Sequence, residues 1–207
     1  DAMESRGLGD VYKRQEISRE PLGVVGIISP WNFPIAIPAW KAAPAMMCGN
    51  AVILKPASLT IGSAVALTEI ISKQDIPKGL FNLVLGSGSD IGHKIAVHPE
   101  IAAISFTGSV QTGRQLYKDA SSTMKKMQME MGSKNPLIIM DDADLKTAIT
   151  CAVNGAYGGT GQKCTASSRL IVHENIYKKF IDGLVENIKN LKVGHALDCL
   201  LYTSPSP

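Results

Sequence analysis

Short apolar runs alternate along this chain with segments whose apolar residues recur at helical spacing. The runs predict strands over residues 22–28, 51–54, 81–85, 101–106, 124–131, 137–140 and 169–172. The intervening segments predict helices over residues 35–48, 60–72, 90–97, 109–120, 144–157 and 175–191. Strands that are apolar on both faces and are each followed by a helix indicate an α/β fold, with a parallel sheet covered on both sides.

Length and charge narrow the function classes. The chain has 207 residues, of which 45 % are hydrophobic, enough for one domain and part of another. The net charge of +3 is small and its basic residues are scattered, which argues against nucleic-acid binding. No apolar run reaches membrane-spanning length. The four cysteines show neither metal-ligand nor disulfide-framework spacing, and no signal peptide is recognised, so we expect a cytoplasmic protein without a metal.

One cysteine has unusual surroundings. Cys164 lies among small and polar residues, just before the apolar run 170–172. Structural cysteines usually sit in apolar faces. Gly161 gives the backbone room, and Lys163 and Arg169 add positive charge that favours a thiolate. This window alone fits a reactive cysteine and an ordinary loop cysteine about equally.

The ends of three predicted strands carry groups suited to a nucleotide, because parallel sheets bind ligands outside their carboxyl ends. Lys55 follows one strand and could hold a ribose hydroxyl or a phosphate. Thr107-Gly108-Ser109 opens a helix, whose free N–H groups suit a phosphate, although a Gly-Ser pair there is also a common cap. Gly86, Gly88 and Gly92 do not match the dinucleotide fingerprint, and alone they indicate a strand–helix turn.

Together these stretches resemble the NAD(P)-dependent aldehyde dehydrogenase superfamily. Five motifs occur in the family's order, from about residue 16 to residue 198: Pro30-Trp31-Asn32-Phe33-Pro34, Lys55-Pro56-Ala57-Ser58, Phe106-Thr107-Gly108-Ser109, Met129-Glu130-Met131-Gly132 and Gly161-Gln162-Lys163-Cys164. The window around Cys164 is most similar to α-ketoglutarate semialdehyde dehydrogenases. The resemblance covers less than half of a usual family member.

The resemblance implies a role for each motif. Cys164 would attack a small aldehyde substrate, and the Asn32 amide with the Cys164 backbone N–H would hold the oxyanion. Glu130 would activate the water that hydrolyses the thioester, and Lys41 matches a family lysine near the base and the nicotinamide. Read alone, Asn32 is a turn residue, while Glu130 and Lys41 are solvated charges.

The predicted cofactor contacts lie mostly at the strand ends. They are Ser29, Pro30, Trp31, Lys55, Ser58, Gly88, Phe106, Thr107, Gly108, Ser109 and Glu130. Many family members that prefer NAD carry a glutamate where this chain has Ser58. A carboxylate repels a 2′-phosphate and serine does not, so we expect NADP, or both cofactors. Ser58 or Thr60 is also a candidate helix cap.

We therefore expect a partial, Rossmann-like coenzyme-binding domain over residues 16–132 and a truncated start of an α/β catalytic domain over 133–198. Residues 1–15 and 199–207 are expected to be non-native or disordered. The parent protein is expected to be a homo-oligomer, and the chain alone to be inactive because its sheet edges and core face are uncovered. Two alternatives remain: a relative that passes the acyl group to coenzyme A, which Glu130 argues against, and a dinucleotide-binding pseudo-enzyme.

Overall fold

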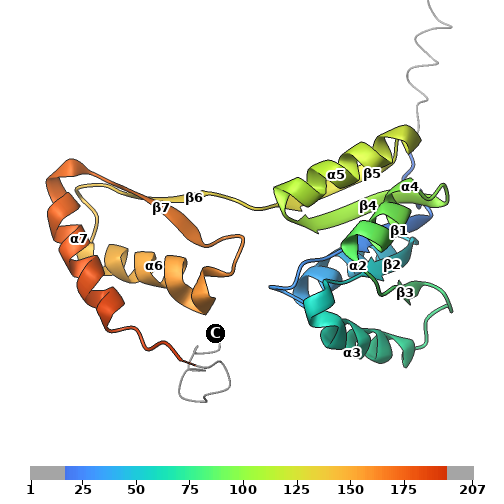
Figure 1. The fold of residues 1–207 in the computed structure, drawn as a ribbon, viewed down its shortest axis with the longest axis horizontal. Helices are drawn as coiled ribbons and strands as arrows, with labels where there is room; N and C mark the ends of the chain where they lie inside the picture. Colours follow the sequence, from blue (N-terminus) through green and yellow to red (C-terminus); the bar gives the residue numbers. More distant parts are fainter. Residues whose placement is uncertain (1–16, 195–207) are drawn as a thin grey trace, which may run out of the picture. The chain divides into compact units, whose positions relative to one another are not determined.

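The protein divides into two compact units between Met131 and Gly132. A computed structural model describes residues 17–194 of these units (Figure 1). The predictions for residues 1–15 and 199–207 lie outside the described residues. In the described part of the chain, no helix combines the length and apolar character needed to cross a membrane.

The first unit is built on a parallel sheet of five strands in the order β3-β2-β1-β4-β5. The strands are β1 (Val24–Ile28), β2 (Ala51–Lys55), β3 (Phe81–Leu83), β4 (Ile101–Gly108) and β5 (Lys126–Met131). Every neighbouring pair is parallel. The predicted parallel α/β fold is confirmed.

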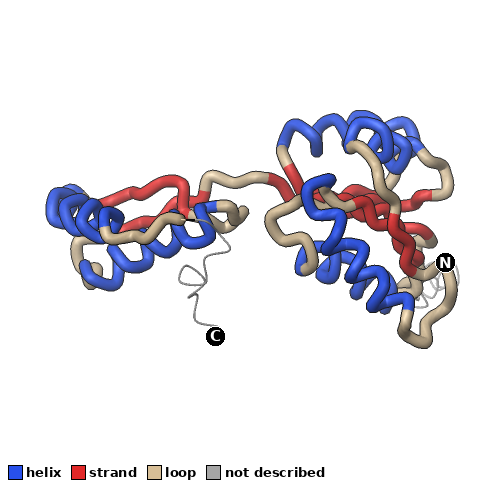
Figure 2. The backbone as a smooth tube through the Cα atoms, turned by 60° about the horizontal axis from the view of Figure 1, so that its bottom comes forward, coloured by secondary structure: helices blue, strands red, loops and turns tan. Residues whose placement is uncertain are grey.

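Helices cover both faces of this sheet, which lies between two helical layers (Figure 2). The helices are α2 (Ala36–Met47), α3 (Ile61–Ser72), α4 (His93–Val97) and α5 (Val110–Ala120). Side chains alternate across a strand, so Ile27 of β1 packs with Ala42 of α2 and Ala64 of α3. Ile28 belongs to the opposite core, with Ile95 of α4 and Leu116 of α5.

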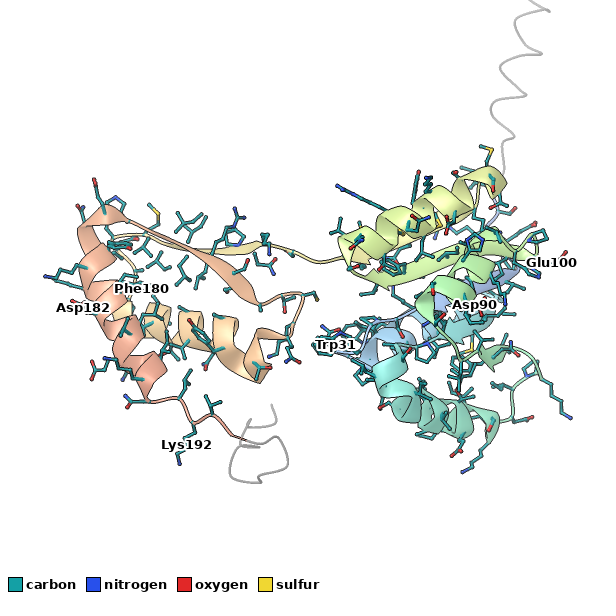
Figure 3. All side chains as sticks on the ribbon, viewed as in Figure 1. Trp31, Asp90, Glu100, Phe180, Asp182 and Lys192 are labelled. Atoms are coloured by element: carbon teal, nitrogen blue, oxygen red, sulfur yellow. The ribbon has the colours of Figure 1, made fainter. Side chains whose placement is uncertain are left out.

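The second unit is a βαβ segment followed by a helix. Strands β6 (Asn135–Ile139) and β7 (Ser167–Val172) pair in parallel, and α6 (Leu145–Tyr157) connects them. Helix α7 (Glu174–Lys189) packs on α6 through Phe180, which is fully buried (Figure 3). The other side of the strand pair carries exposed apolar residues, with Ile138 61 % and Ile171 51 % exposed.

Local predictions differ from the structure at three places. Thr60 is the N-cap residue of α3, but its side chain makes no capping hydrogen bond and donates to the Ala57 carbonyl instead, while Ser58 lies in a short 3-10 helix, η1 (Ser58–Thr60). The helix predicted over 90–97 begins as a π-helical turn, η2 (Gly88–Gly92), before α4. Strand β4 continues through Gly108, two residues beyond its predicted end.

The central strand depends on a glycine for its packing against α4. A Cβ added to Gly26 would lie 2.5 Å from Cγ2 of Ile95, which is buried and β-branched and has little freedom to move. Gly62, in the first turn of α3, has no atom within 4 Å of the same added carbon. The two glycines therefore form a matched pair for measuring the packing constraint.

We expect Gly26→Ala to lower the free energy of unfolding by about 1–3 kcal/mol, because overpacking forces Ile95 or β1 to shift. Gly62→Ala should leave that free energy unchanged or raise it slightly. Urea unfolding of both variants measures the difference. Equal stabilities would contradict the close approach of α4 to β1.

Candidate active site

The chain reverses direction across the first sheet at β1 and β4. From β1 it runs outward through β2 to β3, and then returns to place β4 on the other side of β1. In open parallel sheets a ligand crevice forms at such a point, outside the carboxyl ends of the two strands. Ser29 follows β1, and Gly108 and Ser109 close β4. The sheet topology therefore brings two of the predicted cofactor-binding segments to one place.

Two buried polar residues end the neighbouring strands. The Ser29 side chain is 5 % exposed, and its Oγ has no hydrogen-bond partner within residues 17–194. Lys55 is 4 % exposed, and its Nζ donates to the Pro56 carbonyl at 2.9 Å. Burial lowers the pKa of Lys55 below its ordinary value. A buried hydroxyl without a partner is costly, and a bound ligand is one way to satisfy it.

The end of β4 leads directly into α5. Ser109 is the N-cap of this helix: its Oγ accepts from the Thr112 N–H at 3.1 Å and donates to Thr112 Oγ1 at 2.9 Å. A Cβ on Gly108 would lie 2.6 Å from the Phe106 ring, so packing against this ring favours glycine here. Phe106 is 2 % exposed and forms part of the core.

A groove of about 700 Å³ lies between η2 and α5. Its lining residues come from η2, the first residue of α4 and α5: Gly88, Ser89, His93, Gln111, Thr112, Gln115, Leu116 and Asp119. His93 Nδ1 lies 3.0 Å from Asp119 Oδ2, and this hydrogen bond holds the pKa of Asp119 below its usual value. Gly88 thus borders a concave surface beside the helix that Ser109 caps.

These groups fit a dinucleotide. The first turn of α5 offers backbone N–H groups and a positive helix end to a phosphate. The groove beside it has room for a flat base, and the unpartnered Ser29 hydroxyl lies at the end of the adjacent strand. Ser58, at the start of η1, is exposed and places no negative charge after β2.

The loop after β1 carries further predicted residues. Trp31 projects from it with 45 % of its surface exposed (Figure 3). Pro30 and Asn32 are half-buried in the same loop, and Thr107 is half-buried near the end of β4.

Three elements of the first unit join in one hydrogen-bonded chain. Lys41 Nζ, from α2, donates to Ser105 Oγ at 2.8 Å and to Gln128 Oε1 at 2.7 Å. Gln128 Nε2 donates to Glu130 Oε1 at 3.1 Å. Burial lowers the pKa of Lys41, and the charge of Glu130 opposes this effect more weakly. The predicted pair Lys41 and Glu130 is therefore linked through Gln128.

The cysteine loop belongs to the second unit. Cys164 is exposed and follows a turn in which Gly159, Thr160 and Gly161 all have positive φ, between 58° and 69°. The left-handed region is unfavourable for a β-branched residue such as Thr160, so the surrounding loop must hold it there. Strained backbone of this kind occurs preferentially at functional sites.

Asn135 fastens this loop to the start of β6. Its Nδ2 donates to the Cys164 carbonyl at 2.6 Å and to the Ala166 carbonyl at 3.1 Å. Its Oδ1 accepts from Ser133 Oγ at 2.6 Å. The Ser133 hydroxyl thereby orients the Asn135 amide.

Sequence reasoning missed Gln128, Ser105 and Asn135. Gln128 lies two residues before Glu130, so strand periodicity places both on one face, and Ser105 is the register partner of Gln128. Asn135 had no comparable signal in the sequence, because its partners lie 29 and 31 residues away. In the part of the chain that the structure describes, no group of three or more His, Cys, Asp or Glu side chains could hold a metal.

The chain is similar to known proteins in both its sequence and its fold. A profile of the aldehyde dehydrogenase family matches residues 4–205. The chain is 46 % identical over 188 residues to an α-ketoglutaric semialdehyde dehydrogenase of Bacillus subtilis, an alignment that covers 91 % of this chain and 38 % of that relative. The chain therefore spans well under half the length of that protein.

The fold of the chain is also similar to the folds of solved structures. A betaine aldehyde dehydrogenase from Staphylococcus aureus in complex with NAD+ matches with a TM-score of 0.85 at 39 % identity, over 87 % of this chain and 36 % of that one. A structure described as an NADP-dependent enzyme of E. coli matches with a TM-score of 0.84 at 39 % identity, over 87 % of this chain and 37 % of that one.

The Asn135 contacts can be tested without measuring catalysis. We expect Asn135→Ala to speed backbone hydrogen exchange around residues 161–167 by roughly thirtyfold, because two hydrogen bonds worth about 1 kcal/mol each are lost. Ser133→Ala, which keeps both amide contacts, should have a smaller effect. Exchange in Asn135→Ala that matches the parent protein would contradict the role of Asn135 in holding the loop.

Proposed function

The chain belongs to the aldehyde dehydrogenase family, and from this membership we propose that the complete protein oxidises an aldehyde to a carboxylic acid with NAD(P)+. We assign the nucleophile to Cys164, the oxyanion donor to Asn32 and the base to Glu130. The 207-residue chain is proposed to have no turnover by itself, since it spans 38 % of a semialdehyde dehydrogenase relative.

The observation that carries this proposal is the chemistry of the β1–β4 switch point. An unpartnered buried hydroxyl, a capped helix N-terminus and a groove lie at or next to this one edge of the sheet. Each is complementary to part of a dinucleotide. The loop that carries Asn32 leaves the same edge, which supports the assignment of its amide to the reacting end of the cofactor.

The first chemical step belongs to Cys164. Its thiolate attacks the aldehyde carbon, a C–S bond forms, and the π electrons of the carbonyl move onto oxygen. The Asn32 side-chain amide and the Cys164 backbone N–H donate to this oxyanion. Losing one such donor typically costs ~10²–10³ in turnover. Asn135 donates to the Cys164 carbonyl and so restrains the loop that carries the nucleophile.

The second half of the reaction frees the enzyme. The bound nicotinamide would supply the hydride acceptor for the aldehyde carbon. Loss of that hydride leaves a thioester on Cys164, and Glu130 takes a proton from water as the water oxygen attacks the thioester carbon. The C–S bond then breaks, the thiolate leaves, and the carboxylic acid is released.

Relatives of known name support a proposal for the substrate class. Alpha-ketoglutarate semialdehyde dehydrogenases and a 2,5-dioxopentanoate dehydrogenase are 43–46 % identical to this chain. We propose a semialdehyde substrate, such as α-ketoglutarate semialdehyde. The Cys164 window supports this choice, since it is most similar to that subfamily.

We further propose NADP as a cofactor, used alone or together with NAD. Ser58 follows β2 at the position where many NAD-preferring family members carry glutamate. The serine is exposed and uncharged, so a 2′-phosphate meets no like charge from it.

The nucleophile assignment is tested by Cys164→Ala in the complete protein. We expect aldehyde-dependent formation of NAD(P)H to fall by more than about 10⁴-fold, while NADPH binding, followed by fluorescence, stays within twofold. Cys48→Ala and Cys151→Ala are matched controls, because both are exposed cysteines of the same chain, and they should keep parent activity. Turnover that survives in Cys164→Ala would overturn the mechanism.

Cofactor choice is tested by Ser58→Glu. We expect the ratio of kcat/KM with NADP to kcat/KM with NAD to fall by about tenfold or more, because the new carboxylate repels the 2′-phosphate. Ser58→Gln has a similar size and no charge, and should keep the parent ratio. An unchanged ratio in Ser58→Glu would show that this position does not face the ribose.

A further inference from the structure

Strand β5 presents two different faces. Met127 and Met129 pack against the core formed with α4 and α5. Gln128 and Glu130 alternate with them, so both lie on the opposite face, towards α2. Gln128 also pairs in register with Ser105 of β4, and the Ser105 hydroxyl donates to Gln128 Oε1 at 2.5 Å.

The partners of Gln128 fix which way its amide points. The Lys41 ammonium can only donate, so it requires the amide oxygen at 2.7 Å. An ionised Glu130 can only accept, so it requires the amide nitrogen at 3.1 Å. If the amide were flipped, its NH₂ group would face the Lys41 ammonium, and its oxygen would face the Glu130 carboxylate. Lys41 therefore determines that Gln128 offers an N–H to the carboxylate.

We propose that Gln128 is the positioning residue of the base: polarised by Lys41 and Ser105, its amide holds Glu130 Oε1 so that Oε2 can take the proton of the hydrolytic water. This inference rests on the proposed function, in which Glu130 activates that water. Gln128 itself touches neither substrate nor cofactor in this role.

The Glu130 carboxylate needs a hydrogen bond to orient it, because its exposed position on the strand does little to restrict its rotamers. Glu130 is exposed on the strand, and a long side chain there samples several rotamers. A general base contributes typically 10²–10⁴-fold only when it is within hydrogen-bond reach of the proton it removes. One charge-assisted hydrogen bond from a fixed amide selects one orientation of the carboxylate.

The test uses the complete protein and distinguishes the contact made by the amide oxygen from the contact made by the amide nitrogen. Gln128→Leu removes both contacts at similar size. Gln128→Glu keeps an acceptor for Lys41 but has no donor for Glu130 at neutral pH. Glu130→Gln is the reference for loss of the base, and Lys126→Gln, on the same exposed face two residues earlier, is the control. Rapid mixing measures the first hydride transfer, and steady-state assays measure turnover.

We expect Gln128→Leu and Gln128→Glu to transfer the first hydride within twofold of the parent rate. Their steady-state turnover should fall by about tenfold, a part of the general-base contribution. NAD(P)H should then form in a burst of one equivalent per active site, as in Glu130→Gln. Thermal unfolding checks that each variant is folded, and Lys126→Gln should behave as the parent.

Four results would overturn the inference. Parent turnover in both Gln128 variants would show that Glu130 needs no positioning. Parent turnover in Gln128→Glu alone would show that only the contact with Lys41 matters. A hydride-transfer rate that falls in parallel with turnover would place the role of Gln128 before the thioester. Parent turnover in Glu130→Gln would instead remove the base from the proposed function, and Gln128 with it.

Discussion

The parallel pairing of β1 with β4 is the constraint on which the first unit depends. Residues of β1 contribute to the cores on both sides of the sheet, so neither strand can move without disturbing α2, α3, α4 or α5. This rigidity has a functional consequence. Ser29 and Ser109, which are among the residues proposed to bind the cofactor, follow these strands immediately. Their positions are therefore restrained by the strands. Sites built on strand ends are more precise than sites on free loops.

Much of this architecture could be predicted from the sequence. Every strand predicted between residues 22 and 172 is present, because most contain a run of apolar residues and β5 alternates methionines with polar residues. Details that depend on local competition were predicted less well. Thr60 satisfies its hydroxyl on the Ala57 carbonyl rather than at the helix N-terminus, and the turn at Gly88–Gly92 widens into a π-helix. Propensity cannot choose between such alternatives of similar energy.

In the candidate site, too, local sequence motifs were easier to interpret than contacts between distant residues. Cys164, Glu130 and Asn32 could be proposed from the sequence because each lies in a short motif that can be read locally. Gln128 and Asn135 were not, because their roles exist only through partners far away in the sequence: Lys41 lies 87 residues from Gln128, and Cys164 lies 29 residues from Asn135. In both cases an amide connects two groups with opposite hydrogen-bonding requirements. Such residues become visible only when the fold brings their partners together.

In the proposed mechanism, the Gln128 amide separates the Lys41 ammonium from the carboxylate assigned as the base. An ammonium in direct contact with a carboxylate stabilises its ionised form and so makes it a weaker base. A carboxylate with no partner keeps its basicity but not its orientation. Gln128 lies between Lys41 and Glu130. Its amide orients the Glu130 carboxylate, while the charged Lys41 ammonium makes no direct hydrogen bond to that carboxylate. Burial of Lys41 also lowers the pKa of its ammonium group, so the protein environment stabilises this positive charge less than water does. The arrangement suits a group that must alternately hold and release a proton.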